Sequence, residues 1–210
     1  MKDHAMPAEP STARSWIGQP VKRVEDGRLL TGRGRFIDDH APCAGVHHAA
    51  IVRSPHAHAR ILGYDVSAAL AMEGVVGVVT GDDVAKLTKP FSVGVTAPVR
   101  YYCAATDKAR FVGEPVAVVV ARSRYLAEDA AEAVVVRYEP LPAVVDVERA
   151  LDPDAPVLHE AVGSNLAGNR RLVYGDPDGA FAQAEVVIRE RFRYPKYSST
   201  PIETYGVIAR

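Results

Sequence analysis

The sequence is poor in cysteine, with only Cys43 and Cys103 among its 210 residues, and neither belongs to a Cys-x-x-Cys pair. A disulfide framework and an iron–sulfur cluster held by this chain are therefore not encoded. With so few thiols, a reducing, cytoplasmic setting is the expectation. Both cysteines are predicted to be small packed residues rather than nucleophiles, because no helix N-terminus or basic neighbourhood is evident around either one.

Long apolar runs and an excess of one charge are also missing. No stretch approaches the roughly eighteen apolar residues of a membrane span, and residues 1–15 lack the apolar core of a signal peptide. The formal net charge of −1 gives no electrostatic reason to expect nucleic acid or an anionic membrane as the main partner. Residues 1–16 are expected to form a disordered N-terminal arm.

No catalytic motif is complete. Gly32-Arg33-Gly34 could cradle an anion, but Ile37 stands where the dinucleotide fingerprint needs its third glycine, so a plain turn is the better interpretation. The pairs Asp38-Asp39 and Asp82-Asp83 are adjacent in sequence, and adjacent side chains point to opposite faces of a strand. These carboxylates are therefore predicted to close turns rather than to act together on one bond.

Histidines suggest a metal site at first sight, because His47, His48, His56 and His58 fall within one short segment. His56 and His58 would share one side of an extended chain, as two ligands might. No third ligand follows at a recognisable spacing, so packing or a hydrogen bond is favoured over metal binding. We accordingly assign no catalytic, cofactor-binding or metal-binding residue.

The sequence is rich in apolar residues, at 48%, and residues 111–142 read as strand, helix, strand. Val116 to Ala121 is a β-branched run typical of a strand buried on both faces. Ser123 can cap the helix, and a strand from Val134 to Tyr138 should end at Pro140 and Pro142. The helix carries an apolar stripe at Ala127, Ala130, Ala131 and Val134.

An earlier segment repeats this order. Residues 45–53 and 75–80 are predicted strands, Ile61-Leu62 starts a short strand, and Ser67 can cap a helix of one to two turns. Residues 86–107 then form a long connection between the two strand–helix–strand units. The segment before them, residues 16–39, is dense in glycine and charge and is expected to be an extended leader lying across a larger surface.

The last part of the chain has its own pattern. Residues 176–183 are predicted to form a short helix, residues 184–194 an amphipathic strand, and residues 203–209 a further strand. Two strands without a completed sheet would leave unpaired edges and one apolar face exposed. Something outside this sequence should cover them.

Five ordered segments carry a resemblance to a known family. The segments are GQPVKRVEDGRLLTGRGRFIDD (18–39), IVRSPHAHARI (51–61), AMEGVVGVVTGDDV (71–84), VGEPVAVVVARSRYLAEDAAEAVVVRYEPLP (112–142) and YPKYSSTPIETYGVIA (194–209). Together they resemble the opening of the large chain of molybdenum hydroxylases, the family of xanthine dehydrogenase, aldehyde oxidase and aerobic carbon monoxide dehydrogenase.

The resemblance implies an α+β fold in which residues 30–145 form an α/β hammerhead domain of mixed sheet and short helices. The first strands of an incomplete molybdenum-cofactor-binding domain would follow. We therefore expect the leader and the hammerhead domain over residues 17–150, and a linker with the start of the molybdopterin-binding domain over residues 151–210.

The resemblance also implies cofactors and partners. In this family the large chain holds a molybdenum–pterin cofactor, expected here in the cytosine dinucleotide form. Electrons leave through [2Fe–2S] clusters on a small subunit to FAD on a medium subunit. The residues that perform this chemistry in relatives lie beyond the point matching Arg210. Glu203, in the family motif Pro201–Thr204, could support the cofactor region, make an ordinary buried hydrogen bond or stand as an acid at the end of a strand.

The implied function is the N-terminal part or a split subunit of a molybdenum hydroxylase. It would have a structural, channel-lining and subunit-docking role, and oxygen would come from water. The substrate stays open between an aldehyde, an N-heterocycle, a purine and carbon monoxide. Whether the chain is a natural split subunit or a fragment also stays open. The alternative is a free-standing, non-catalytic hammerhead binding module, because fold alone does not fix function. A small independent enzyme is the weakest interpretation.

Overall fold

A computed structural model describes residues 16–40, 44–91, 94, 97–195, 199–201 and 203–209. The disordered arm expected at residues 1–16 lies outside this range except for Trp16. The chain divides into two compact units, one from Met1–Pro42 with Phe192–Arg210 and one from Cys43–Arg191. Within the described residues, no helix is both long enough and apolar enough to cross a membrane.

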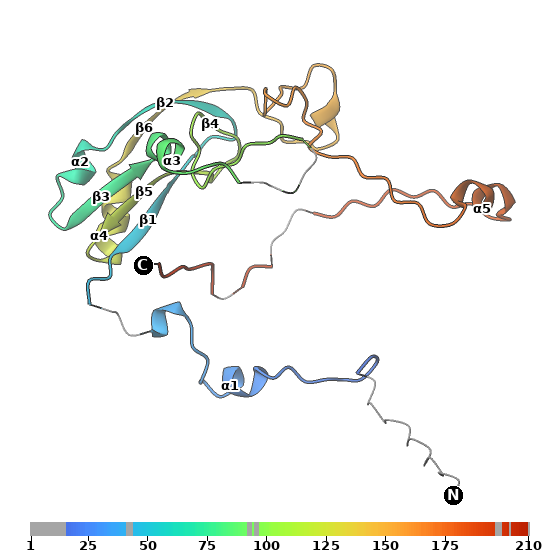
Figure 1. Ribbon diagram of the computed structural model, residues 1–210, viewed down its shortest axis with the longest axis horizontal. Helices are drawn as coiled ribbons and strands as arrows, with labels where there is room; N and C mark the ends of the chain where they lie inside the picture. The colour runs from blue at the N-terminus through green and yellow to red at the C-terminus, as the bar shows by residue number, and fades with distance from the viewer. Residues whose placement is uncertain are drawn as a thin grey trace, which may run out of the picture. The chain divides into compact units, whose positions relative to one another are not determined.

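The larger unit contains two three-stranded sheets, with strand orders β1-β5-β3 and β4-β2-β6 (Figure 1). Every pair of neighbouring strands is antiparallel. The strands of the first sheet are β1 (His48–Arg53), β5 (Pro115–Ala121) and β3 (Val75–Thr80). Those of the second are β4 (Lys108–Ala109), β2 (Ala59–Asp65) and β6 (Val135–Pro140).

Both predicted strand–helix–strand units are confirmed, and each contributes one strand to each sheet. The first runs β2, α2 (Ser67–Leu70), β3, and the second runs β5, α4 (Arg124–Glu132), β6. The sheets are therefore antiparallel rather than mixed as expected. Parallel neighbours within one sheet would need a crossover that returns to the same sheet. Here residues 66–74 and residues 122–134 each lead from one sheet into the other.

The core lies between the first sheet and α4. Every residue of β5 is buried or half-buried, which confirms the prediction for Val116 to Ala121. The Ser123 Oγ accepts a hydrogen bond of 3.2 Å from the backbone N–H of Leu126, so Ser123 is the N-cap of α4 as predicted. The predicted apolar stripe of this helix packs on the sheet, and the buried cluster comprises Ala69, Val119, Ala130 and Val134.

Two helix starts differ from the sequence prediction. Val66, not Ser67, is the N-cap of α2, because Ser67 instead donates from its N–H and its hydroxyl to the Asp65 carboxylate, over 3.0 and 2.6 Å. An unpredicted helix, α3 (Gly81–Leu87), begins directly after β3. Asp83 lies in its first turn and accepts a 2.9 Å hydrogen bond from the N–H of Thr80, completing a capping box.

The C-terminal part of the larger unit is less regular. The predicted helix is confirmed as α5 (Pro177–Gln183), whose N-cap Asp176 accepts a hydrogen bond of 3.0 Å from Gly179. A 3₁₀ turn, η2, covers Arg149–Leu151. The strands predicted at residues 184–194 and 203–209 are wrong, since neither segment is a strand in the structure. A strand requires a partner for its N–H and C=O groups, and no described segment pairs with either one.

The smaller unit contains two short helical turns. These are α1 (Asp26–Leu30) and the 3₁₀ turn η1 (Ile37–Asp39), so the leader predicted to be extended includes helical structure. No residue of either turn is buried. Most of the large apolar side chains described in this unit are exposed, and they include Trp16, Ile17, Val21, Val24, Leu30, Phe192, Tyr205, Val207 and Ile208.

Candidate functional site

The histidines singled out in the sequence make separate local contacts in the structure. His58 is only 5% exposed, and its Nδ1 lies 2.7 Å from the carbonyl oxygen of Pro142. The ring of His56 packs edge-on against Tyr138, with ring centroids 4.9 Å apart. His47 is exposed and His48 is half-buried at the start of β1. Among the residues that the structure describes, no three His, Cys, Asp or Glu side chains could hold a metal ion.

The glycine and aspartate motifs serve local structure. Gly32 has a left-handed φ of +68°, and the N–H of Arg33 donates to the carbonyl of Arg28 over 2.8 Å, so this segment is a turn as predicted. Asp39 accepts a 2.9 Å hydrogen bond from the N–H of Phe36, the residue before η1, so it caps the start of that turn. The prediction that Asp82 and Asp83 close a turn is wrong, because they open α3. Thr80 supplies the capping hydroxyl that begins this helix.

The structure describes only one of the two cysteines. Cys43 lies outside the described residues. Cys103 is a free, exposed cysteine, so its predicted place in the core is wrong. Its neighbours Ala104 and Ala105 are the buried residues of that irregular segment. A short side chain in a loop can face solvent while the next residues pack, which sequence periodicity does not reveal outside regular elements.

A charged cluster ties the segment around β4 to residues 158–160. Arg110 donates to both carboxylate oxygens of Asp107, each over 3.1 Å, and its Nε donates to the carbonyl of Leu158 over 3.1 Å. The Lys108 ammonium, which is 6% exposed, pairs with the carboxylate of Glu160. The cluster consists of neutralising pairs, so it is a structural connection rather than an unpaired charge awaiting a ligand.

The pKa values of three neighbouring groups follow from these contacts. The hydrogen bond from Lys108 holds the pKa of Glu160 below its usual value. Burial raises the pKa of Glu114, although this carboxylate also accepts a hydrogen bond from the backbone N–H of Arg110. Burial, with the nearby cations of Arg110 and Lys108, lowers the pKa of His159, so its imidazole is neutral at pH 7.

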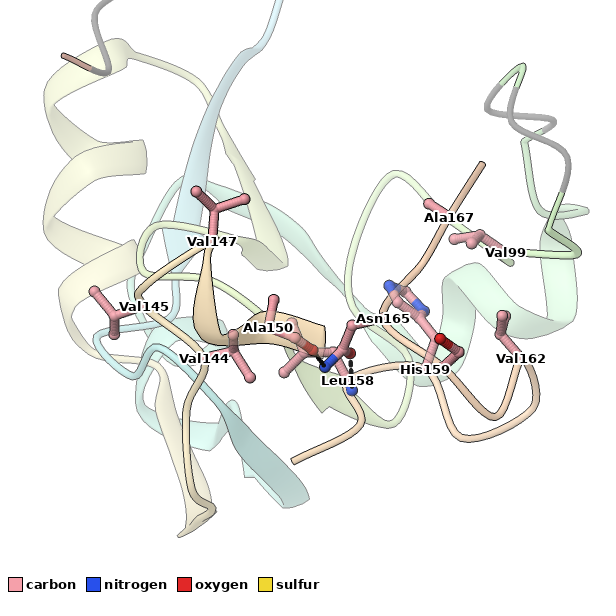
Figure 2. Close-up of a pocket in the computed structure, with 11 residues that line it drawn as sticks. Val99, Val144, Val145, Val147, Ala150, Leu158, His159, Val162, Asn165 and Ala167 are labelled. Carbon is pink, nitrogen blue, oxygen red and sulfur yellow. Dashed lines mark hydrogen bonds between the residues drawn. The ribbon is translucent and has the colours of Figure 1, made fainter. Parts of the chain in front are cut away.

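Next to this cluster lies a cavity of about 250 Å³, called here the 144–167 pocket. Figure 2 shows Asn165 between the chain segments that form its wall. The Asn165 Oδ1 accepts a 3.0 Å hydrogen bond from the N–H of Leu158. Its Nδ2 donates to the carbonyls of Ala150 and Pro156, over 2.9 and 3.0 Å. The lining residues are Val99, Val144, Val145, Val147, Ala150, Leu158, His159, Val162, Ser164, Asn165 and Ala167.

The chemistry available in this pocket is that of binding. Most of its lining is aliphatic, and no carboxylate, ammonium or guanidinium group belongs to it. His159 has no second acid–base group beside it in the lining, and the hydroxyl oxygen of Ser164 accepts a 3.1 Å hydrogen bond from the N–H of Leu166. Sequence reasoning missed this site entirely. The only local signal was the cluster of valines Val144, Val145 and Val147 directly after Pro142, in a segment without helical or strand periodicity.

Glu203 has an ordinary structural contact. Its Oε1 accepts a hydrogen bond of 2.7 Å from the backbone N–H of Ile37. Both residues belong to the smaller unit and both are exposed or half-buried. The contact joins the leader to the C-terminal segment, and because Glu203 is exposed it is not the buried hydrogen bond considered from the sequence.

The 144–167 pocket does not fit a molybdenum–pterin cofactor. It offers aliphatic walls rather than the hydrogen-bond donors that a pyrophosphate and a pterin require. At the Gly32–Gly34 turn, a Cβ on Gly32 would meet no atom within 4 Å, whereas one on Gly34 would lie 3.0 Å from Leu29. No cofactor chemistry is therefore derived from these residues.

Comparison with known proteins identifies the fold. Residues 31–142 match the family described as "Aldehyde oxidase and xanthine dehydrogenase, a/b hammerhead domain". The chain is 38% identical over 215 residues to the carbon monoxide dehydrogenase large chain of Afipia carboxidovorans, covering 96% of this chain and 26% of that one. It is 39% identical over 208 residues to the nicotine 6-hydroxylase large subunit of Paenarthrobacter nicotinovorans, covering 95% and 25%.

A solved structure gives the same result. The crystal structure of quinoline 2-oxidoreductase from Pseudomonas putida 86 superposes with a TM-score of 0.68 at 41% identity, covering 81% of this chain and 22% of that chain. The α/β hammerhead fold expected from the sequence is therefore confirmed. The chain spans about a quarter of the length of the curated relatives it matches.

Proposed function

The chain belongs to the aldehyde oxidase and xanthine dehydrogenase hammerhead family, and from this premise we propose that it is the N-terminal part, or a split subunit, of a molybdenum-containing hydroxylase. Its own role is to line the substrate channel and to dock the other polypeptides. The likeness to large chains over about 95% of its length carries this proposal. The reaction inserts oxygen from water into a small substrate.

In this proposal, other polypeptides bind the cofactors. The remaining molybdopterin-binding polypeptide holds the molybdenum–pterin cofactor, in its cytosine dinucleotide form. A small subunit carries the [2Fe–2S] clusters and a medium subunit carries FAD. The aliphatic lining of the 144–167 pocket supports a cofactor held on other polypeptides. We place this assembly in the cytoplasm, as the scarcity of cysteine favours.

The division of the chain is part of the same proposal. Residues 17–150 supply the leader and the hammerhead domain, and residues 151–210 supply the linker and the start of the molybdopterin-binding domain. Residue 150 falls at the 3₁₀ turn η2, after the last strand of the two sheets, which supports a boundary in this region. Glu203 then belongs to the second part and acts through its hydrogen bond to Ile37.

Exposed apolar side chains favour this role over a free-standing binding module. Trp16, Ile17 and Val24 in the leader are exposed, as are Tyr205 and Val207 near the other end. A module that works alone would be expected to bury such residues or to replace them with polar ones. Their number in the smaller unit supports a partner that covers them.

Native mass spectrometry of the chain isolated from its own cells tests the proposal. Molybdenum, iron and flavin would be quantified on whatever co-purifies. We expect a cofactor-carrying polypeptide together with iron–sulfur and flavin subunits. Reconstitution from the purified subunits provides the second arm, in which omission of this chain should abolish substrate oxidation. A metal-free monomer in cells, or full activity of the partners without this chain, would overturn the proposal.

A further inference from the structure

The 144–167 pocket is not explained by the hammerhead fold, because its lining comes from the segments that precede and follow the second strand–helix–strand unit. We propose that this pocket receives an apolar side chain from the polypeptide that carries the molybdenum cofactor. Residues 144–167 are then a docking surface for that polypeptide. The inference rests on the proposed function and names where that partner binds.

The pocket is already organised without an occupant. Asn165 fixes three points of its wall through hydrogen bonds with Leu158, Ala150 and Pro156. Arg110, which directly follows β4, holds the same segment in place by donating a hydrogen bond to the carbonyl of Leu158. Because these contacts fix the backbone in advance, a partner would lose little free energy to ordering when it binds.

The electrostatics of the pocket suit an uncharged, apolar occupant. No Asp, Glu, Lys or Arg belongs to the lining, and His159 is neutral at pH 7. Beside the pocket, Lys108 pairs with Glu160 and Arg110 with Asp107. Asp146, between Val145 and Val147, is exposed and does not belong to the lining. Filling the cavity itself would therefore bury no charged lining group, a condition met at the core of stable protein interfaces.

Two valines of the lining point to a surface that is covered in the assembly. Val145 is 89% exposed and Val147 is 84% exposed in the chain by itself. Apolar side chains that are almost fully in water gain from burial against a partner. When aliphatic residues surround a preformed apolar cavity, one side chain inserted by the partner can provide much of the binding energy.

The length of the relatives indicates the occupant. The chain corresponds to 26% of the Afipia carboxidovorans large chain, so in the proposed enzyme about three quarters of a large chain must adjoin it. That polypeptide is the nearest and largest source of apolar side chains. A second copy of this chain or a small neutral molecule would be the competing occupants.

Hydrogen exchange followed by mass spectrometry tests the proposal. The chain alone is compared with the chain in complex with the molybdenum-carrying polypeptide isolated from its own cells. We expect exchange of residues 144–167 to slow at least tenfold in the complex. In the double variant Val145→Asp and Val147→Asp, the amount of that polypeptide retained per chain should fall at least fivefold. Both positions are so exposed that the free chain should keep its circular dichroism spectrum.

A matched control is Val76→Asp on β3, where the valine is 57% exposed and outside the pocket lining. This variant should retain the molybdenum-carrying polypeptide at the wild-type level. If the complex forms but exchange of residues 144–167 is unchanged, or if the double variant binds as the control does, the inference is overturned and the proposed function stands. Protection of the pocket by self-association or by a small molecule in the isolated chain also overturns it. If no molybdenum-carrying polypeptide is found, the proposed function fails and the inference fails with it.

Discussion

The backbone N–H of Ile37 donates a hydrogen bond of 2.7 Å to the Oε1 of Glu203, across a separation of 166 residues. A Cβ placed on Gly206 would approach the Cδ1 of Ile37 to 2.5 Å, so the same two segments also come close through apolar atoms. The leader and the C-terminal segment thus belong to one compact unit although the hammerhead domain separates them in sequence.

Replacing Glu203 tests how much that hydrogen bond orders the leader. In Glu203→Ala the Ile37 N–H loses its acceptor, and we expect its hydrogen exchange to quicken by roughly five- to tenfold, because an intramolecular hydrogen bond contributes about 1 kcal/mol. Glu203→Gln keeps a side-chain carbonyl acceptor and should change exchange by less than about twofold. Equal behaviour of the two variants would show that the contact does not hold the leader.

Gly81 lies at a close approach that only glycine permits. A Cβ on Gly81 would fall 1.9 Å from the carbonyl oxygen of Ala105. That backbone cannot shift freely, because the N–H of Ala105 donates to Pro115 on the central strand β5 over 2.8 Å. Gly81→Ala should lower the free energy of unfolding by about 1–3 kcal/mol or more through overpacking. The measurement is denaturant unfolding followed by circular dichroism.

The control for this substitution is Gly77→Ala on the neighbouring strand β3. A Cβ on Gly77 meets no atom within 4 Å, so there is no steric cost. Alanine also restricts the unfolded chain more than glycine does, and the change in stability should be about zero or slightly favourable. If Gly77→Ala lowered the free energy of unfolding as much as Gly81→Ala does, the steric explanation would be contradicted.

The sequence predicted the elements whose signals are local. Val116 to Ala121 is a continuous apolar run, and Ser123 stands one residue before a helix with a regular stripe, so strand, cap and helix were all placed correctly. The helix α3 was missed because its signal, Thr80 with Asp83 three residues later, was read as the end of a strand. A capping box with Asp in place of Glu or Gln is a weaker form of the usual pattern.

The features that sequence reasoning could not supply depend on distant residues. The pairing of β3 with β5 and of β2 with β6 distributes each strand–helix–strand unit over two sheets, and periodicity within one unit does not encode this. The pocket wall depends on Asn165 contacting Ala150 and Leu158, which lie in irregular segments. An asparagine in a loop has no periodic pattern to mark it as buried structure.

The Lys108–Glu160 pair should give the protein a distinct acid sensitivity. Lys108 holds the pKa of Glu160 below its usual value of 4.5, so the folded state binds the carboxyl proton more weakly than the unfolded state does. The stabilisation is therefore fully present above about pH 4.5 and is lost as the pH falls through the lowered pKa of the folded state. Glu160→Gln should remove this part of the pH dependence of unfolding.

At pH 7 the same variant leaves Lys108, whose side chain is 6% exposed, without a neutralising carboxylate, although the glutamine amide oxygen can still accept its hydrogen bond. We expect a loss of about 1 kcal/mol in the free energy of unfolding, because the partner side chain at position 160 is largely exposed and water screens the lost charge. Glu148→Gln is the control, since Glu148 pairs with Arg191 at 3.5 Å with both side chains largely exposed. It should change stability by less than about 0.5 kcal/mol. Equal losses in both variants would refute a special role for the buried lysine.

Asn165 should determine whether the 144–167 pocket exists in solution. Asn165→Ala removes an acceptor for the N–H of Leu158 and two donors to carbonyls, and the freed backbone groups of Ala150 and Pro156 are half-buried. Each lost hydrogen bond contributes on the order of 1 kcal/mol, so we expect a loss of about 2–3 kcal/mol in local stability. The readout is faster hydrogen exchange over residues 150–165 with unchanged exchange in β5 and α4.

Asn165→Asp distinguishes this network from simple loss of packing. The substitution keeps the size of the side chain and an acceptor for Leu158, but it replaces the two donated hydrogen bonds with a carboxylate facing two carbonyl oxygens. We expect exchange over residues 150–165 to quicken at pH 7 at least as much as in Asn165→Ala. Lowering the pH until the new carboxyl is protonated should partly restore protection, because a protonated oxygen can donate again. If Asn165→Asp instead protects these residues as well as asparagine does, the two donated hydrogen bonds do not hold the wall, and the valines of the pocket must be organised by packing alone.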